Sequence, residues 1–297
     1  MRRSYVLAVA LAGCGFSVPS GTPPGDGPHG DAPRDAADAP ADIAPLGPWG
    51  NITLISELSS TSAEDDPTLT ADMLEIYFDR SGDIYGSTRA AITDPWSTPQ
   101  PVVAINTTST ETTCEVSPDG LELFFSSNRI GGAGLNDIYV ATRPNRVQAF
   151  GNPVRVTELA TTGDDVTPTT VGASALVMYL TSTHDNGSLD LYRSTRATRM
   201  SAWATPVLIT ELQTTNSETE PTLYAGETAM IFSGTGAGRD LFVTTRPTTS
   251  APWGPPAPIT ELNTGLSEED PWVSPDGRTL FFASTRSGVY EFYRATR

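Results

Sequence analysis

The stretch 117–143, SPDGLELFFSSNRIGGAGLNDIYVATR, decides the fold because it holds two short strands and the turns that flank them. Its runs LELFFSS and DIYVAT are rich in aromatic and β-branched residues, and Pro, Asp, Gly and Asn stand at their ends, which is typical of strands. SPDG at 117–120 is a turn sequence, since proline presets φ and the Asp-Gly pair completes the reversal. The stretch therefore predicts consecutive antiparallel strands.

The same pattern recurs five times at intervals of about 50 residues. An aromatic residue precedes a short strand in each repeat, at Trp49, Trp96, Phe150, Trp203 and Trp253. A strand that ends in arginine closes each repeat, at 83–89, 137–143, 190–196, 240–246 and 291–297. Repeats of 40–50 residues with four strands each are typical of β-propellers. Residues 48–297 are therefore predicted to be an all-β, five-bladed β-propeller of four-stranded blades, and the recurrent aromatics are predicted to pack between blades.

The two ends of the repeat region predict how the ring closes. The region begins with an outer-type strand, Ile52 to Leu58, and the chain ends just after a third-type strand, at Arg297. The last blade therefore lacks an outer strand, which the N-terminal strand can supply. An open solenoid would need capping repeats, and none is visible.

Composition excludes several function classes. A net charge of −17 and a pI near 4.4 argue against a nucleic-acid partner, because phosphate binding needs a basic surface. Lysine is absent, which excludes lysine-based catalysis. His29, His184, Cys14 and Cys114 are the only histidines and cysteines, so neither a histidine-rich metal site nor a disulfide framework is expected. The sequence predicts no cofactor and no metal.

The N-terminus has the organisation of an export signal. Arg2 and Arg3 precede a short apolar run, and residues 1–13 are predicted to be a signal peptide. The following Leu11-Ala12-Gly13-Cys14 resembles the lipobox of bacterial lipoproteins, which implies a lipid on Cys14 and attachment to a membrane of the cell envelope. In that family Gly15 after the cysteine implies the outer membrane of a Gram-negative cell.

Residues 14–47 are predicted to be a disordered linker, because Pro, Gly, Ala and Asp dominate and large apolar residues are almost absent.

The segments 117–143 and 274–288, SPDGRTLFFASTRSG, resemble the WD40-like PD40 repeat of TolB-type propellers. The other three repeats keep the strands but lose SPDG. The resemblance spans about 250 residues and implies a bacterial envelope protein with a propeller fold. It implies little about activity, because propellers serve both as enzymes and as binding scaffolds.

Acidic residues recur where each outer strand leads into the next innermost strand. In a propeller these connections emerge on one face, called here the top face. The candidate binding residues are Glu64, Asp65, Asp66, Glu111, Asp164, Asp165, Glu218, Glu220, Glu268, Glu269 and Asp270. They are expected to lie in loops around the mouth of the central channel. Carboxylates there could bind a cation, a cationic group of a partner, or a sugar; alternatively, they cap turns and keep the protein soluble.

Two functions from different classes fit this pattern. The favoured one is a lipid-anchored envelope module that binds a protein, peptide or glycan through its acidic top face. The alternative is a glycoside hydrolase or lyase that uses carboxylates at the channel mouth, for which two carboxyls with divergent pKa values are needed. A purely structural spacer is a third, weaker possibility. The expected loop placement of the acids favours binding over catalysis.

Overall fold

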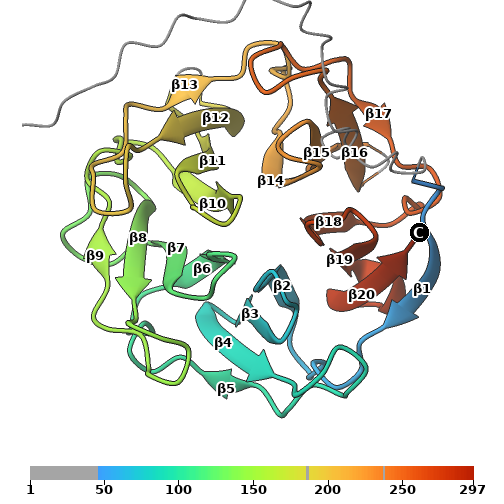
Figure 1. The fold of residues 1–297 in the computed structure, drawn as a ribbon, viewed down its shortest axis with the longest axis horizontal. Helices are drawn as coiled ribbons and strands as arrows, with labels where there is room; N and C mark the ends of the chain where they lie inside the picture. Colours follow the sequence, from blue (N-terminus) through green and yellow to red (C-terminus); the bar gives the residue numbers. More distant parts are fainter. Residues whose placement is uncertain (1–45, 185–186, 237) are drawn as a thin grey trace, which may run out of the picture. The chain divides into compact units, whose positions relative to one another are not determined.

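The computed structural model describes residues 46–184, 187–236 and 238–297. The predicted signal peptide, Cys14 and the linker up to residue 45 lie outside these residues. In the described part, twenty strands form five four-stranded antiparallel sheets set around a common axis (Figure 1), which confirms the predicted five-bladed propeller. No helix among the described residues is long and apolar enough to cross a membrane.

The blades are numbered along the chain, each from its innermost strand outward. Blade 1 contains β2 (Glu64–Leu69), β3 (Glu75–Arg80), β4 (Asp83–Thr88) and β5 (Gln100–Pro101). Blade 2 contains β6 (Glu111–Val116), β7 (Glu122–Ser127), β8 (Asp137–Thr142) and β9 (Val154–Arg155). Blade 3 contains β10 (Asp165–Val171), β11 (Val177–Ser182), β12 (Asp190–Thr195) and β13 (Val207–Leu208).

Blade 4 contains β14 (Thr219–Tyr224), β15 (Ala229–Thr235), β16 (Arg239–Thr245) and β17 (Ala257–Pro258). Blade 5 contains β18 (Glu268–Val273), β19 (Thr279–Ser284), β20 (Glu291–Thr296) and, from the other end of the domain, β1 (Gly50–Leu54).

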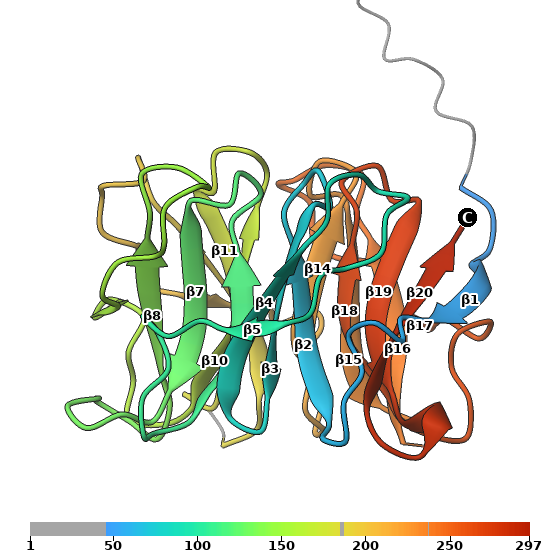
Figure 2. The same ribbon diagram turned by 90° about the horizontal axis from the view of Figure 1, so that it is seen from below.

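The first strand closes the ring, as predicted. β1 pairs antiparallel with β20, with Thr53 opposite Arg294 and Leu54 opposite Tyr293, so the two ends of the domain share one sheet (Figure 2). The strand is shorter than predicted, because the chain turns after Leu54 and the Leu58 amide donates to the Ile55 carbonyl at 3.1 Å. Closure therefore rests on backbone hydrogen bonds and needs no disulfide.

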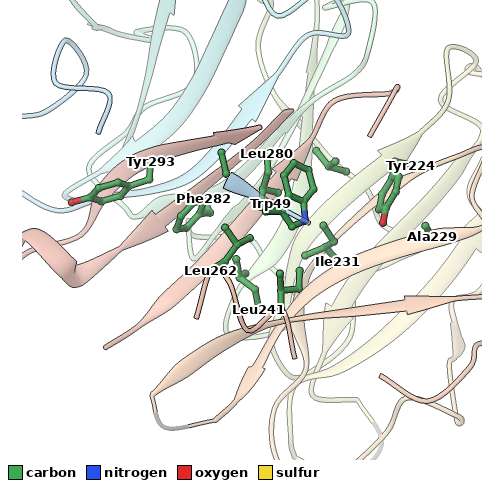
Figure 3. Close-up of a cluster of buried hydrophobic side chains, with 12 residues drawn as sticks. Trp49, Tyr224, Ala229, Ile231, Leu241, Leu262, Leu280, Phe282 and Tyr293 are labelled. Carbon is green, nitrogen blue, oxygen red and sulfur yellow. The ribbon is translucent and has the colours of Figure 1, made fainter. Parts of the chain in front are cut away.

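The core consists of five apolar layers, one between each pair of adjacent blades. The layer between blades 4 and 5 is shown in Figure 3, where Trp49 from the start of the domain packs with Ile231 of β15 and Leu280 of β19. Each sheet is buried on both faces by its neighbours, which explains why the second strands read as continuous apolar runs.

An arginine stacks on the recurrent aromatic residue in every blade. The distances from the guanidinium carbon to the ring centre are 4.0–4.4 Å for Arg297–Trp49, Arg89–Trp96, Arg143–Phe150, Arg196–Trp203 and Arg246–Trp253. The other side of the aromatic meets the preceding blade, as where Phe150 lies edge-on to Tyr77 with ring centres 5.7 Å apart. The prediction that these aromatics pack between blades is confirmed.

Replacing Trp49 tests how much the closing contact stabilises the ring. Trp49 is 5% exposed, and Trp49→Ala is expected to lower the free energy of unfolding by about 3–5 kcal/mol, since it leaves a cavity and removes the stack with Arg297. The measurement is urea unfolding followed by fluorescence. Val103→Ala is the matched control: Val103 is 81% exposed, so its change should stay within about 0.5 kcal/mol. Equal effects of both variants would contradict this role.

Candidate functional site

The first group of candidate residues occupies the start of each innermost strand rather than a loop. These five side chains are at most 4% exposed and belong to Glu64, Glu111, Asp165, Glu218 and Glu268. The expectation that they lie in surface loops is wrong, because the innermost strands begin about three residues earlier than the sequence suggested. Four of the five lie inside a strand, and Glu218 directly precedes β14.

Each of these carboxylates closes the turn that leads into its own strand. Thr107 donates to Glu111 through its amide at 2.7 Å and its hydroxyl at 2.8 Å, and Thr264 does the same to Glu268 at 2.8 and 2.9 Å. An arginine at or just after the end of the second strand completes the cap in three blades, at 2.8–3.1 Å for Arg80–Glu64, Arg129–Glu111 and Arg286–Glu268. These acids are therefore engaged in holding the top loops together.

Two positions further on, every innermost strand carries a β-bulge. The pairing register with the second strand shifts at the same place in all five blades. The residue at the shift has a positive φ of 47–55° in every case: Asp66, Thr113, Thr167, Glu220 and Asp270. A left-handed conformation is costly for a residue with a side chain, by about 1–3 kcal/mol, and such strain concentrates at functional sites. All five residues line the central channel.

The chemistry of this ring differs between its two halves. In blades 2 and 3 the bulge residues are threonines with hydrogen-bond partners. The Thr167 amide donates to the Thr113 hydroxyl at 3.2 Å. The hydroxyls of Thr113 and Thr167 also share hydrogen bonds with those of Ser126 and Thr181, respectively. In blades 4, 5 and 1, which are consecutive around the ring, the bulge residues are acids. The neighbouring positions add three more carboxyls, and the resulting set is called here the acid cluster: Asp65, Asp66, Asp79, Glu220, Glu269 and Asp270.

The part of the acid cluster in blades 4 and 5 is compact. One carboxylate oxygen from each of Glu220, Glu269 and Asp270 lies within 4.8 Å of the others. Arg239, at the start of β16, donates to Glu269 at 3.0 Å and to Glu220 at 3.1 Å. The Asp270 amide donates to Glu220 Oε2 at 3.3 Å. Glu220 and Glu269 therefore share one guanidinium, and Asp270 joins them through its amide.

The part in blade 1 is short of hydrogen-bond donors. Asp79 is 7% exposed and lies opposite Asp65 in the β2–β3 ladder. Within the described residues, the buried Oδ1 atoms of Asp65 and Asp79 have no hydrogen-bond partner. Buried polar atoms without a partner are rare, and each requires an explanation.

Crowding and burial give the carboxyls of the acid cluster different pKa values. Burial, with repulsion from Asp79 and Glu269, raises the pKa of Asp65 to about 7, and burial raises the pKa of Asp79 to about 6. Burial and neighbouring carboxylates hold the pKa values of Asp66 and Asp270 well above the ordinary value. The pKa of Glu220 is lowered despite its burial, because Arg239 and several hydrogen bonds favour its ionised form. The carboxyls of the cluster therefore differ in acidity.

Space at the bulge ring is limited. The cavity lined by the bulge residues and the prolines that follow them has a volume of about 30 Å³, which is room for one or two water molecules or a single ion. Of the remaining candidates, Asp164 is half-buried at the top loop, where Asn136 donates to it at 2.7 Å. The structure thus brings Asp65, Asp66, Glu220, Glu269 and Asp270 together and keeps the caps and Asp164 apart from them.

The opposite mouth of the channel is wider and more apolar. A cavity of about 350 Å³ there is lined by residues that include Leu69, Val171, Leu223 and Trp272. Glu115 also lines it, and burial raises the pKa of Glu115 to about 8 although the Thr68 hydroxyl donates to it at 2.7 Å. At neutral pH this carboxyl is mostly protonated.

Sequence reasoning missed Asp79, Arg239 and Glu115. A signal for the acids exists in the aligned repeats. The position before Pro67, Cys114, Pro168, Pro221 and Pro271 is an acid in three repeats and threonine in two. Asp79 stands where the other blades have Ser126, Thr181, Ser233 and Ala283.

Glu115 gives the stability of the fold a pH dependence. Its pKa is about 8 in the folded chain and about 4.3 in an unfolded one, so between pH 5 and 8 the folded state keeps a proton that the unfolded state has released. Stability therefore falls as pH rises through this window, at about 1.4 kcal/mol per pH unit for such a group. Asp65 and Asp79 add to the same trend.

Glu115→Gln is expected to lessen the loss of stability between pH 5.5 and 8 by a few kcal/mol, because a glutamine stays neutral and still accepts from Thr68. Urea unfolding of wild type and variant at both pH values measures it. An unchanged pH dependence in the variant would show that Glu115 ionises normally in the folded chain.

No protein-family model and no curated protein sequence matches this chain. Solved structures do. An α-L-arabinofuranosidase from Lactobacillus brevis is similar over 82% of this chain and 94% of its own, with a TM-score of 0.59 and 10% identity. An endo-arabinase from Bacteroides thetaiotaomicron is similar over 81% and 95%, with a TM-score of 0.58 and 14% identity. A putative TolB from Agrobacterium tumefaciens is similar over 80% and 78%, with a TM-score of 0.53 and 16% identity. At these identities the likeness shows a shared propeller fold alone.

Proposed function

We propose that this chain is a lipid-anchored β-propeller of the bacterial cell envelope that binds a protein, peptide or glycan through the acidic mouth of its channel. The PD40-like repeats and the structural likeness to a putative TolB support a propeller of this kind. The lipobox-like Leu11-Ala12-Gly13-Cys14 supports the anchor and, with Gly15, an outer-membrane location.

One observation carries the binding role: the acid cluster breaks the repetition of an otherwise regular ring. Every blade has its cap and its bulge, so neither requires acids at the bulge position. Threonines fill that position in blades 2 and 3 and satisfy their own hydrogen bonds. The carboxyls of blades 1, 4 and 5 repel one another instead. Departures from local consistency of this kind are expected at functional sites. Glu220 and Glu269 also keep side-chain exposures of 15% and 14%, so the cluster reaches solvent.

The structure supports the enzymatic alternative in one respect and opposes it in another. In its favour, the acids of the cluster are buried within strands and have divergent pKa values, as a glycosidase requires. However, the 30 Å³ cavity at the ring has no room for a sugar ring. Binding at the mouth is therefore favoured over hydrolysis within it.

The binding role predicts a loss of partners when the exposed part of the cluster is neutralised. The test variant is Asp65→Asn with Glu269→Gln, which avoids the caps Glu64 and Glu268 and so spares the top loops. The matched control is Glu57→Gln with Glu158→Gln, which replaces two carboxylates by amides at exposed positions outside the cluster. Affinity capture from envelope extracts should recover a partner with wild type and control but not with the test variant. The same partners from all three proteins would contradict binding at the cluster.

The anchor predicts that Cys14→Ser abolishes fractionation with membranes, because serine cannot carry the thioether-linked lipid. Membrane and soluble fractions of cells that express either form are compared by immunoblot. The Trp49→Ala chain, in which Cys14 is intact, controls for loss of stability. Membrane association of the serine variant equal to that of wild type would contradict the lipoprotein assignment.

A further inference from the structure

We propose that a cleft between blades 5 and 1 binds a small organic carboxylate through Arg89 and Arg294. The closing strand β1 and the segment that follows β4 contribute to its walls (Figure 1). Its volume is about 320 Å³, which is in the range of about 300–1,000 Å³ typical of small-molecule sites. The cleft lies outside the central channel, so this site is independent of the function proposed for the acid cluster.

The two arginines come from adjacent blades and lie close together. Arg294 belongs to β20 and lies opposite Thr53 of β1. Arg89 directly follows β4 and stacks on Trp96, with 4.2 Å between the guanidinium carbon and the ring centre. Burial and repulsion from Arg294 lower the pKa of Arg89. Two like charges held near each other are unfavourable unless an anion balances them.

The cleft between blades 3 and 4 shows how the fold balances such a pair. Arginines occupy the same two repeat positions there, as Arg193 and Arg246. One carboxylate oxygen of Glu227 lies 3.6 Å from Arg193 and 3.7 Å from Arg246. Arg246 also donates to the Tyr179 hydroxyl at 3.0 Å. In this cleft the chain itself therefore supplies a carboxylate and a hydroxyl to the two guanidinium groups.

Both of these partners are missing from the cleft between blades 5 and 1. The counterpart of Glu227 is Met73, because the carbonyl of each residue accepts from the stacked arginine of its own blade, at 2.9 and 2.8 Å. The counterpart of Tyr179 is Phe281, because both lie opposite the residue that follows the proline of the innermost strand. Phe281 lines the cleft.

No other carboxylate of the chain takes the place of Glu227 here. Within the described residues, neither Arg89 nor Arg294 forms an ion pair. An anion from outside the chain would therefore supply what Glu227 supplies in the other cleft.

The lining selects the kind of anion. Guanidinium groups pair with carboxylates through directed, charge-assisted hydrogen bonds. Glu57 and Asp94 also line the cleft and attract Arg89 from a distance. They would repel a doubly charged phosphate more than a singly charged carboxylate. Leu54 and Ile92, which are 44% and 48% exposed, add apolar surface. The ligand class is therefore a monocarboxylate with an apolar body.

Calorimetric titration of the full chain in detergent with 4-phenylbutyrate tests the proposal. Wild type is expected to bind this probe with a dissociation constant below about 1 mM. The uncharged 4-phenylbutanamide has the same apolar part and should bind about tenfold or more weakly, because hydrogen bonds to charged groups are the stronger ones. The matched phosphate, 3-phenylpropyl phosphate, should also bind more weakly than the carboxylate.

The first variant is Arg294→Gln, which removes a guanidinium that has no hydrogen bond or ion pair among the described residues. It should unfold at the wild-type temperature and bind the probe about tenfold or more weakly. The matched control is Arg193→Gln, at the same repeat position of blade 3, which should keep the wild-type affinity. Met73→Glu with Phe281→Tyr copies the internal partners of the other cleft and should abolish binding. If this double variant fails to fold, Arg294→Gln still decides the question.

Absence of heat with millimolar 4-phenylbutyrate would overturn the site, as would equal affinities for the carboxylate and its amide. Equal affinities of wild type and Arg294→Gln would also overturn it. The same loss in Arg193→Gln would show that overall charge, rather than this cleft, attracts the probe. Tighter binding of the phosphate would overturn the carboxylate assignment. None of these outcomes bears on partner capture through Asp65 and Glu269, which is measured separately.

Discussion

Burial between blades is the constraint on which the rest of the structure depends. Each sheet is apolar on both faces and must be covered on both, so the five layers exist only when the ring is complete. The first strand is therefore recruited into the last blade, and Trp49 lies in the layer that it seals. Because the apolar faces are buried between the blades, the edges of the innermost strands line the channel. Polar side chains can therefore occupy it.

The bulge turns this edge into a potential site. An edge strand offers unpaired backbone groups, and the positive φ at the bulge aims one side chain per blade at the axis. The scaffold therefore presents five equivalent positions whose chemistry can vary while the fold stays the same. Threonines at two of these positions form an uncharged surface whose hydroxyls have hydrogen-bond partners within the channel wall. Acids at the other three crowd together where water is scarce, and burial and mutual repulsion raise the pKa values of Asp66 and Asp270.

Repetition made the architecture predictable, since five coincident copies of the same strand pattern fix the number of blades and the closure. The acids were misplaced for a physical reason. Proline is normally barred from strand interiors, which predicts that the innermost strands begin at Pro67 and its equivalents. At the channel edge, however, the proline nitrogen needs no ladder partner, and the strands begin three residues earlier, at Glu64 in blade 1. The sequence does not predict the roles of Asp79 and Arg239, because both residues contact acids of other strands.

The two kinds of acid also show why fold and function separate here. Acids such as Glu64 and Glu111 recur in every blade, pair with arginine or with turn residues, and act as part of the scaffold. Asp66, Glu220 and Asp270 occupy a repeat position that is threonine in blades 2 and 3, and they meet because blades 4, 5 and 1 are neighbours around the closed ring. Propellers of similar shape include an arabinofuranosidase and a putative TolB, so the shape cannot decide between catalysis and binding. The space at the bulge ring bears on that choice, because a cavity of about 30 Å³ has no room for a sugar ring.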